Sequence, residues 1–480
     1  MPRIAVLGGS VVGSVTALLF ARSGWSVDLI DPELDVFSGD EPGELRSRPG
    51  APHTVQAHGF MSRTLFELTS RLPDVRQGLE DAGAVIVRPS QALPPHLYDG
   101  GRPDDHELDT MRIRRVTLDR VIARFVAAEP LVRRVPNRVE GLELEPGSPP
   151  RVRGLRVGGT ALEADLVVDA GGRRSPVAGW LADAGVVVPE RRDPCVSRYY
   201  TRHFRVVGEP PGLNLGYAEV HQFPCLTQLM FLGDRSTAML AQAVHDEDTA
   251  LKSLRHPDAF QAVLRANEGL AAWCAALEPT SQVFCLGAFD NRMRSLVLDG
   301  EPLVLGLQLV GDSLALTNPT RGRGIAMGLA AAGRLHDLVV AEGCRDAELT
   351  TEYDGWCQRV LGVYYRESAV YDAAGDRRLR AGLLGRSVPG NAPAIELPEG
   401  HPVSSGELEA VARLDPDLIR LVTRATMCLD DDRRIGSPEV AARVRELTPS
   451  LPEAGPAPAP EGLDGLHVRE NLVGVLAAFS

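Results

Sequence analysis

The chain has 480 residues, 44% of them hydrophobic, and a formal net charge of −13 at pH 7. This length accommodates two or three domains with buried cores, and the negative charge argues against nucleic acid or an anionic membrane as the main partner. The seven cysteines include no Cys-x-x-Cys pair and no metal-ligand spacing, so we expect buried thiols without a metal or redox role.

The first predicted strand starts at Ile4, three residues after the initiator methionine. That leaves no room for a signal peptide, and no apolar run approaches the length of a membrane span. We therefore expect a cytoplasmic protein.

A strand, a glycine-containing turn and a helix follow one another at the start of the chain. Ile4–Leu7 is an apolar run of strand length, and the turn Gly8-Gly9-Ser10-Val11-Val12-Gly13 comes next. A helical pattern then extends to Gly24, and a second apolar strand ends at Asp31. The stretch is one βαβ unit, the pattern of a dinucleotide-binding fold.

Each residue type in this unit has a physical reason. Gly8 lets the chain turn sharply, and Gly13 lets the helix approach the sheet, so that the first-turn N–H groups face a diphosphate. Asp31, 18 residues after Gly13, can accept hydrogen bonds from a ribose. Ser10 replaces a fingerprint glycine but is small enough for the backbone to approach the ligand. The alternative is an ordinary glycine turn without a ligand.

The next part of the chain mixes helices and strands. The pattern predicts a helix near Leu65–Leu72, a strand at Ala84–Val87, a surface loop near Asp99–Asp109, a helix over Val121–Ala128, a hairpin of 139–144 and 152–157, and a buried strand ending at Asp169.

From Ser197 onward, short alternating strands with aromatic residues predict an antiparallel sheet. They cover 199–206, 226–232 and 237–244, and a helical stretch follows at 257–277. Further predicted elements are a buried strand at 303–312, helices at 325–340, 353–371 and 408–429, and a Pro- and Ala-rich linker or tail at 452–461.

Four of these elements resemble, in the same order, motifs of the FAD-dependent monooxygenases of the aromatic hydroxylase superfamily. They are the N-terminal glycine turn, Arg115-x-x-Leu118-Asp119, Asp169-Ala170-Gly171-Gly172-Arg173-Arg174-Ser175, and Gly311-Asp312 followed by Pro319-x-x-Gly322-x-Gly324. Within the superfamily the chain is most similar to actinobacterial flavin oxidoreductases related to polyether epoxidases. The motifs span residues 1–345.

The resemblance implies a mixed α/β fold. Its parts are a Rossmann-like FAD-binding domain of the glutathione-reductase/aromatic-hydroxylase type, an inserted antiparallel-sheet substrate domain and a helical C-terminal region. The expected boundaries are 1–75, 105–185 and 286–345 for the FAD-binding domain, 76–104 and 186–285 for the substrate-binding domain, 346–450 for the helical region, and 451–480 for a Pro/Ala linker and tail.

The resemblance also implies which residues bind FAD. They are Gly8, Ser10, Gly13, Asp31, Arg48, Arg115, Gly311, Asp312, Pro319, Gly322 and Gly324. A carboxylate at a strand end, here Asp312, can accept from a ribityl hydroxyl, and the helix after Gly324 aims N–H groups at a flavin edge. Arg48 resembles the arginine of an Arg-x-Gly-x-Pro-Gln loop, in which His53 replaces the glutamine and His58 matches the last histidine.

One motif departs from the family pattern. Where the hydroxylases usually carry Ala-Asp-Gly, this chain has Ala170-Gly171-Gly172. In the family this motif is associated with both FAD and NAD(P)H, so the departure puts direct reduction by NAD(P)H in doubt. The expected electron donor is NADPH or NADH, acting directly or through a partner flavin reductase.

The implied function is an FAD-dependent monooxygenase, a hydroxylase or epoxidase of secondary metabolism, acting on a small hydrophobic substrate and O₂. Reduced FAD would form a C4a-hydroperoxide, while the protein positions the substrate and excludes water. No catalytic acid–base pair is needed, and the catalytic residues stay unknown. Candidate pocket residues are His58, Tyr199, Tyr200, His203, Tyr217 and His221, with core packing or surface exposure as the alternative for each.

Other functions share these cofactor motifs. A flavin dehydrogenase or reductase of a prenyl or polyketide chain would insert no oxygen, and an inactive relative would bind FAD structurally or not at all. Flavin halogenases depend on a lysine beside the substrate and on a Trp-x-Trp-x-Ile-Pro stretch. Of the 51 basic residues here only Lys252 is a lysine, and it lies outside the motifs, so halogenation is not expected.

Overall fold

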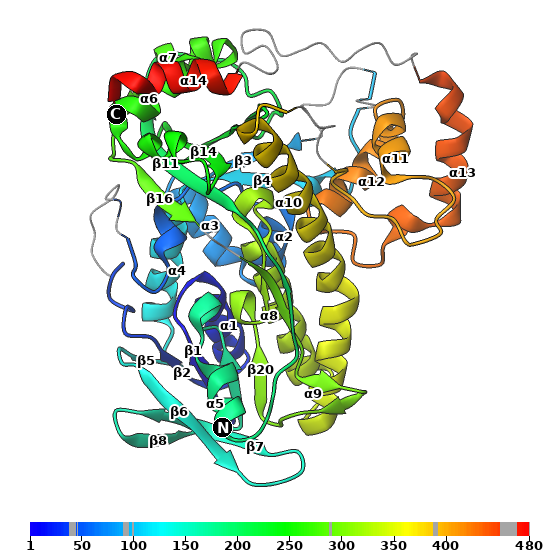
Figure 1. Ribbon diagram of the computed structural model, residues 1–480. Helices are drawn as coiled ribbons and strands as arrows, with labels where there is room; N and C mark the ends of the chain where they lie inside the picture. Colours follow the sequence, from blue (N-terminus) through cyan, green and yellow to red (C-terminus); the bar gives the residue numbers. More distant parts are fainter. Residues whose placement is uncertain are drawn as a thin grey trace.

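The computed structural model describes residues 1–37, 45, 47–89, 96–97, 100–287, 290–386, 392–451 and 468–479. A five-stranded parallel sheet forms the lower half in Figure 1, in the order β20 (Leu307–Leu309), β9 (Leu166–Asp169), β1 (Arg3–Leu7), β2 (Ser26–Ile30) and β5 (Val132–Val135). Val6 pairs with Leu29 on one side and with Val168 on the other. Because helices cover the sheet, its strands are nearly continuous apolar runs.

Helices surround this sheet. They are α1 (Val11–Arg22), α2 (Ser62–Arg71), α3 (Pro73–Asp81), α4 (Arg115–Ala128), α5 (Val177–Asp183) and α8 (Gly324–His336). The α1 helix lies on β1 and β2 and also packs against α4 and α8. The α3 helix packs on α2 and α4, so this part of the predicted 76–104 segment contributes to the core of the parallel sheet.

One core helix is long and apolar enough to cross a membrane, by length and composition alone. It is Gly324–Ala341, which comprises α8 and the π-helix after it, and 61% of it is buried inside the protein. The sequence-based statement that no apolar run approaches a membrane span is therefore corrected. Its buried side chains belong to the main core, which is the place of a core helix in a globular fold.

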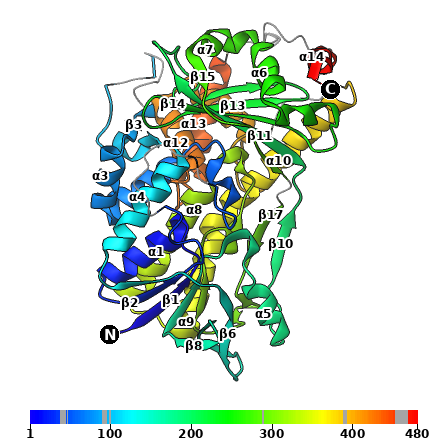
Figure 2. The ribbon, with the colours of Figure 1, turned by 90° about the vertical axis from the view of Figure 1, so that its left-hand side faces the viewer.

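The predicted antiparallel sheet is present above the parallel one (Figure 2). Its order is β12 (Glu219–Gln222), β13 (Thr227–Leu232), β14 (Thr237–His245), β11 (Ser197–Val206) and β15 (Leu277–Pro279), with β16 (Phe284–Gly287) also paired to β11. Because side chains alternate along a strand, Tyr199, Thr201 and His203 contact residues of the parallel-sheet half. Tyr200 and Phe204 point into a second core.

Three helices cover the outer face of this sheet (Figures 1 and 2): α6 (Pro257–Arg265), α7 (Ala271–Ala276) and α14 (Val468–Leu476). The α14 helix buries Val468 and Leu472 in the second core, and Arg469 pairs with Asp248 at 2.8 Å. The predicted linker 452–461 lies outside the described residues. The end of the predicted tail is a docked helix, because its apolar residues recur at helical spacing.

The C-terminal region is helical, as predicted. It contains α9 (Asp346–Trp356), α10 (Gly362–Leu383), α11 (Ser405–Ala412), α12 (Pro416–Thr426) and α13 (Pro438–Leu447). The last three share a separate core. The single helix predicted over 408–429 is wrong, because Asp415 caps a new helix by accepting from Asp417 and Leu418 N–H, with Pro416 in its first turn.

Smaller sheets complete the fold. They are β6 (Val139–Glu145), β7 (Arg151–Val157) and β8 (Thr160–Glu163); β10 (Glu190–Asp193), β17 (Asn291–Arg294) and β21 (Ala315–Leu316); β3 (Val85–Val87) with β4 (Thr110–Arg112); and β18 (Val297–Leu298) with β19 (Glu301–Pro302). The predicted hairpin is thus β6–β7, and the mixed α/β fold class is confirmed.

Three further expectations need correction. The strand predicted over 303–312 shrinks to β20, because the chain bends at Gly306, whose φ is +72°. The predicted 99–109 loop is not wholly on the surface, since Asp105 is buried and pairs with Arg420 at 2.7 Å. Of the seven cysteines, all unpaired, Cys285 is exposed and not buried.

Candidate functional site

The glycine turn after β1 is as tight as its sequence predicts. Gly8 has a φ of +102°, and a side chain there would overlap the Ala170 carbonyl. A Cβ on Gly13 would overlap the Gly8 carbonyl oxygen, so only glycine lets α1 start this close to β1. Ser10 precedes α1, and no side chain caps the helix. The first-turn N–H groups of α1 therefore form an anion-binding end.

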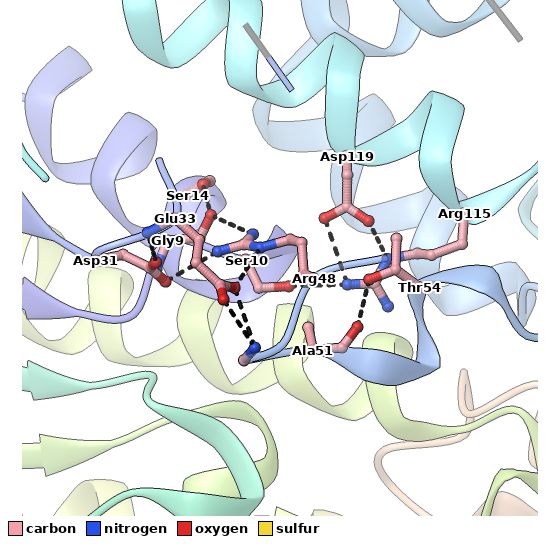
Figure 3. A network of polar contacts seen from close by, with 11 residues as sticks. Gly9, Ser10, Ser14, Asp31, Glu33, Arg48, Ala51, Thr54, Arg115 and Asp119 are labelled. Atoms are coloured by element: carbon pink, nitrogen blue, oxygen red, sulfur yellow. Dashed lines mark hydrogen bonds and ion pairs between the residues drawn. The ribbon is translucent and has the colours of Figure 1, made fainter. Parts of the chain in front are cut away.

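Asp31 and Arg48 meet at the end of β2 (Figure 3). The Asp31 carboxylate accepts from Gly9 N–H at 2.7 Å and from Arg48 Nη2 at 3.0 Å. Arg48 also donates to the Gly9 carbonyl at 3.2 Å and pairs with Glu33 at 3.3 Å. In this arrangement Arg48 holds the loop at 48–50 against the glycine turn, and a ribose that bonded Asp31 would replace one of these contacts.

Arg115 reaches the same turn from the other side (Figure 3). Its side chain is 3% exposed and pairs with Asp119 one helical turn later, at 2.6 Å. The second nitrogen of the guanidinium, Nη2, donates to Ser10 Oγ at 2.9 Å. Arg115 thus places a positive charge beside the open N-terminus of α1. The pair of a helix N-terminus and an arginine is the arrangement that binds a phosphate.

The two glycine motifs, which are about three hundred residues apart in the sequence, are adjacent in the structure. Gly311 has a φ of +60°, and a Cβ there would lie 3.4 Å from Val12 in the first turn of α1. Gly328 of α8 is packed against Val12 as well. The start of α1, the turn η7 (Gly311–Ser313) and the start of α8 therefore form one site, as the sequence-based hypothesis required.

Asp312 is a half-buried carboxylate whose side chain has no hydrogen-bond partner within the described part of the chain. Its Oδ1 lies 3.6 Å from where a Cβ on Gly324 would be, at the start of α8. Burial raises the pKa of Asp312, while the charges of Arg115, Arg292 and Arg173 act to lower it. A partly desolvated carboxylate without a donor is costly, so this group suits a ligand that supplies a hydroxyl.

Asp169 has a structural role. Its carboxylate is 1% exposed and accepts from Gly171 N–H at 2.8 Å, Ser175 Oγ at 2.6 Å and Ser313 Oγ at 3.0 Å. Asp169 therefore ties the Gly171-Gly172 turn to η7 and fixes the backbone beside Asp312. It does not take the place of the missing carboxylate at Gly171.

The loop at 51–58 is fastened to the antiparallel sheet. His203 Nε2 is 2.8 Å from the Val55 carbonyl, and Thr201 Oγ1 donates to Gln56 Oε1 at 2.6 Å. Burial and the charge of Arg115 lower the pKa of His58 to about 3, and burial lowers that of His203 to about 4. The pKa of His53 is lowered well below its usual range, first by burial and then by Arg115. All three rings are neutral at physiological pH.

The segment around Pro319 is anchored at both ends. Tyr199 donates to Asn318 Oδ1 at 2.8 Å, so this pocket candidate holds the segment in place. Gly322 has a φ of +64°, and a Cβ there would lie 2.9 Å from the Gly59 carbonyl. Pro319 itself is exposed between these anchors.

The remaining pocket candidates divide between the two faces of the sheet. Tyr200 is buried in the second core, and His221 pairs with Glu219 at 2.7 Å on the face that carries Met230 of that core. The structure therefore places Tyr200 and His221 away from the glycine motifs. Tyr217 lies near the motif residue Arg321, whose charge acts to lower its raised pKa.

Sequence reasoning missed two buried acids that hold the Pro319 segment. Glu367 of α10, fully buried, pairs with the fully buried Arg323 at 2.9 Å. Asp372 of α10 accepts from Asn291 at 2.9 Å and from Asn318 at 3.0 Å. Burial raises the pKa of Asp372 to about 7. A signal for these acids was their place on the inner side of an otherwise apolar helical pattern, but their partners are distant in sequence.

A groove of about 620 Å³ opens elsewhere, at the edge of the antiparallel sheet. It is lined by Leu45, Arg114, His203, Arg205, Arg235, Thr237, Thr280, Ser281, Gln282 and Phe284. None of these residues belongs to the glycine motifs. In the described residues no group of three His, Cys, Asp or Glu side chains is placed to hold a metal ion.

Solved structures with the same fold are flavoproteins of different activities. The flavin-dependent brominase Bmp2 is 13% identical with a TM-score of 0.60, covering 93% of this chain and 98% of its own. PqsL, a probable FAD-dependent monooxygenase from Pseudomonas aeruginosa, is 16% identical with a TM-score of 0.58, covering 80% and 99%. A flavoprotein/dehydrogenase from Cytophaga hutchinsonii is 12% identical with a TM-score of 0.57, covering 94% and 98%.

No protein-family model matches the sequence, and no curated protein matches it by sequence. The likeness to the solved structures is therefore one of fold, at identities that do not carry function. Because these proteins are a brominase, a probable monooxygenase and a dehydrogenase, the activity of this chain has to be argued from its own residues.

Proposed function

We propose that this chain is an FAD-dependent oxidoreductase, and specifically a monooxygenase that hydroxylates or epoxidises a small hydrophobic molecule. The observation that carries the proposal is the joint site of α1, Arg115 and Asp312. An anion-binding helix end lies there beside a carboxylate that has no hydrogen-bond partner among the residues the structure describes, as a ligand with both a diphosphate and hydroxyl groups requires.

The residues present fit FAD. The N–H groups at the start of α1 and the Arg115 guanidinium would hold the diphosphate, and Asp312 would accept from a ribityl hydroxyl. Glu33 and Asp31 offer carboxylates at the end of β2 for the adenosine ribose, beside Arg48. Gly322 and Gly324 leave the backbone bare where a flat ring can approach. When bound, FAD would supply the redox chemistry.

The chain's own residues would then exclude water and hold the substrate. Burial and the charge of Arg115 keep the rings of His53 and His58 neutral, so neither ring offers an imidazolium as a general acid near pH 7. The balanced overall reaction takes one substrate molecule, one O₂, one NAD(P)H and one proton, and it yields one oxygenated product, one water and one NAD(P)⁺. Flavin-borne oxidation is the mechanism that needs no protein acid–base pair at this place.

The structural similarity to a brominase does not favour halogenation by this chain. Lys252, the single lysine of the chain, lies on the short helix η5 (Ala250–Arg255). That helix packs against α6 and α14 on the outer face of the antiparallel sheet. A lysine beside the substrate is therefore not available at the glycine motifs.

A dehydrogenase that inserts no oxygen is the second candidate. It is favoured by the turn at Gly171, which carries no acid and is fastened instead by Asp169. Turnover under ¹⁸O₂ separates the two functions. A monooxygenase places one labelled oxygen atom in its product, whereas product formed without label contradicts oxygenation and supports the dehydrogenase.

The electron donor needs its own experiment. Rapid mixing of the FAD-loaded protein with NADPH or NADH measures loss of the oxidised flavin absorbance. We expect slow bleaching that accelerates when a flavin reductase is added, because Gly171 replaces the usual acid. Rapid bleaching by a nicotinamide alone would show instead that the chain accepts hydride directly.

A further inference from the structure

Two arginines in one motif, Arg321 and Arg323, have opposite surroundings. Arg323 is fully buried and its charge is matched, because it pairs with Glu367 at 2.9 Å and donates to the Tyr364 carbonyl at 2.9 Å. It joins α8 to α10, and because its side chain is fully buried, none of its nitrogens is accessible to a ligand. Its role is structural.

Arg321 lies two residues earlier, in the short helix η8 (Pro319–Arg321). Its Nη2 donates to the Ala394 carbonyl at 3.2 Å, and its guanidinium lies 4.7 Å from the ring centroid of Tyr371. Within the described residues no carboxylate forms an ion pair with it. A guanidinium has five N–H donors, so most of its capacity is unused by these contacts.

The charge of Arg321 is poorly compensated. Burial and the neighbouring charge of Arg323 both lower its pKa, and the charge of Glu367, which is paired with Arg323 and Arg433, acts to raise it. Asp372 and Glu409 are near enough to be affected by its charge, but burial raises the pKa of both acids. Arg321 is half-buried, and a cation–π contact offsets only part of the cost of desolvating a guanidinium. An anionic ligand would compensate the charge of the Arg321 guanidinium.

We propose that Arg321 is the anion-recognition residue of the substrate site, and that the substrate carries a carboxylate or a similar planar anion on an apolar body. The forked guanidinium binds such a group through two parallel N–H bonds. The ring of Tyr371 lies against Arg321, and Tyr217 is near enough to be affected by its charge; these two rings would provide aromatic surface for the apolar body. The inference rests on the proposed function, since η8 belongs to a segment assigned to FAD.

The test is calorimetric binding of two probes that differ only in charge. 2-Naphthoate is a planar carboxylate, and 2-naphthamide is its neutral counterpart of nearly the same shape. With the FAD-loaded wild-type protein we expect saturable binding of 2-naphthoate that is at least ten-fold tighter than that of 2-naphthamide. In Arg321→Gln the affinity for 2-naphthoate should fall roughly ten-fold or more, which is the scale of a lost charged hydrogen bond.

Matched variants separate charge from structure. Arg321→Lys keeps the charge without the fork and should lose only part of the affinity. Arg359→Gln, at an exposed position of the same C-terminal half, should bind both probes as the wild type does. Thermal midpoints identify a variant that fails to fold, and the charge preference of the wild type needs no variant.

Three results would overturn the inference: equal binding of both probes by the wild type, equal weakening of both probes in Arg321→Gln, or no binding of 2-naphthoate. The same titrations without FAD keep the two proposals apart. If the protein takes up no FAD but still prefers 2-naphthoate through Arg321, the flavin proposal fails and the anion site stands as a site of different use.

Discussion

Val12 of α1 packs against Gly311, with a separation of 3.4 Å from the position a Cβ on Gly311 would take. This contact joins the N-terminal βαβ unit to the turn that carries Asp312. It places an anion-binding helix end beside a carboxylate to which no described residue donates a hydrogen bond. The proposed FAD site depends on this relationship.

The tightness of the junction can be measured at Gly328. A Cβ there would lie 2.5 Å from Val12 Cγ2 and 3.2 Å from Gly311 Cα, so Gly328→Ala should destabilise the protein by about 1 to 3 kcal/mol through overpacking. Gly375 of α10 has open space around it, so Gly375→Ala should stabilise by roughly 0.5 to 1 kcal/mol. Urea unfolding of both variants checks this, and equal effects would refute the packing argument.

Arg115 should govern FAD affinity. Arg115→Gln removes the charge beside Ser10 at the start of α1, and we expect the dissociation constant of FAD to rise by roughly ten-fold or more. Fluorescence titration of FAD measures it. Arg124→Gln, at an exposed position of the same helix, serves as the control. An unchanged constant in Arg115→Gln would exclude a diphosphate from this end of α1.

Asp312 should show opposite effects on stability and on binding. Burial raises the pKa of Asp312, which means that the flavin-free fold destabilises the ionised carboxylate. Asp312→Asn should therefore leave the unliganded protein equally or more stable than the wild type. The same variant should bind FAD about ten-fold more weakly, since it loses a charged acceptor. Parallel unfolding and titration experiments test both. Loss of stability without loss of FAD affinity would make Asp312 a structural residue only.

Asp372 should make stability fall as the pH rises. Its pKa is raised from 3.8 to about 7 in the folded chain, so between these values the folded state binds the proton that the unfolded state has released. The free energy of unfolding therefore decreases from about pH 4 to pH 7, by at most about 4 kcal/mol for a shift of this size. Asp372→Asn should remove this slope.

Urea unfolding of wild type and Asp372→Asn at several pH values measures the slope. The free energy of unfolding of Asp372→Asn should increase relative to that of the wild type as the pH rises from about 4 to 7. A constant difference between the two proteins would show that Asp372 does not titrate in this range.

The sequence predicts the fold where the signal is local. The hydrophobic periodicity and the glycine spacing over Ile4–Asp31 are sufficient to predict the βαβ unit. The alternation of apolar and polar residues is sufficient to predict the strands β11, β13 and β14. Which face each side chain of β11 presents was not predictable, because a shift of one residue exchanges the faces. For that reason the sequence does not distinguish Tyr200, which lies in the second core, from its neighbour Tyr199 as a pocket candidate.

The contacts that hold the Pro319 segment in place cannot be predicted from the sequence, for a different reason. Arg323 and Glu367 are 44 residues apart in the sequence, and the partners Asn318 and Asp372 are 54 apart. Such pairs form only after α8, α10 and β17 have packed together. The sequence shows that each residue is polar within an apolar pattern, but it does not show the partner.

The central claim is that one FAD binds across α1, Arg115 and Asp312. Calorimetric titration of the flavin-free protein with FAD tests it most directly, with Arg115→Gln and Asp312→Asn measured alongside. We predict saturable binding of one FAD per chain, weakened in both variants. No saturable uptake of FAD, or uptake that neither variant weakens, would contradict the claim.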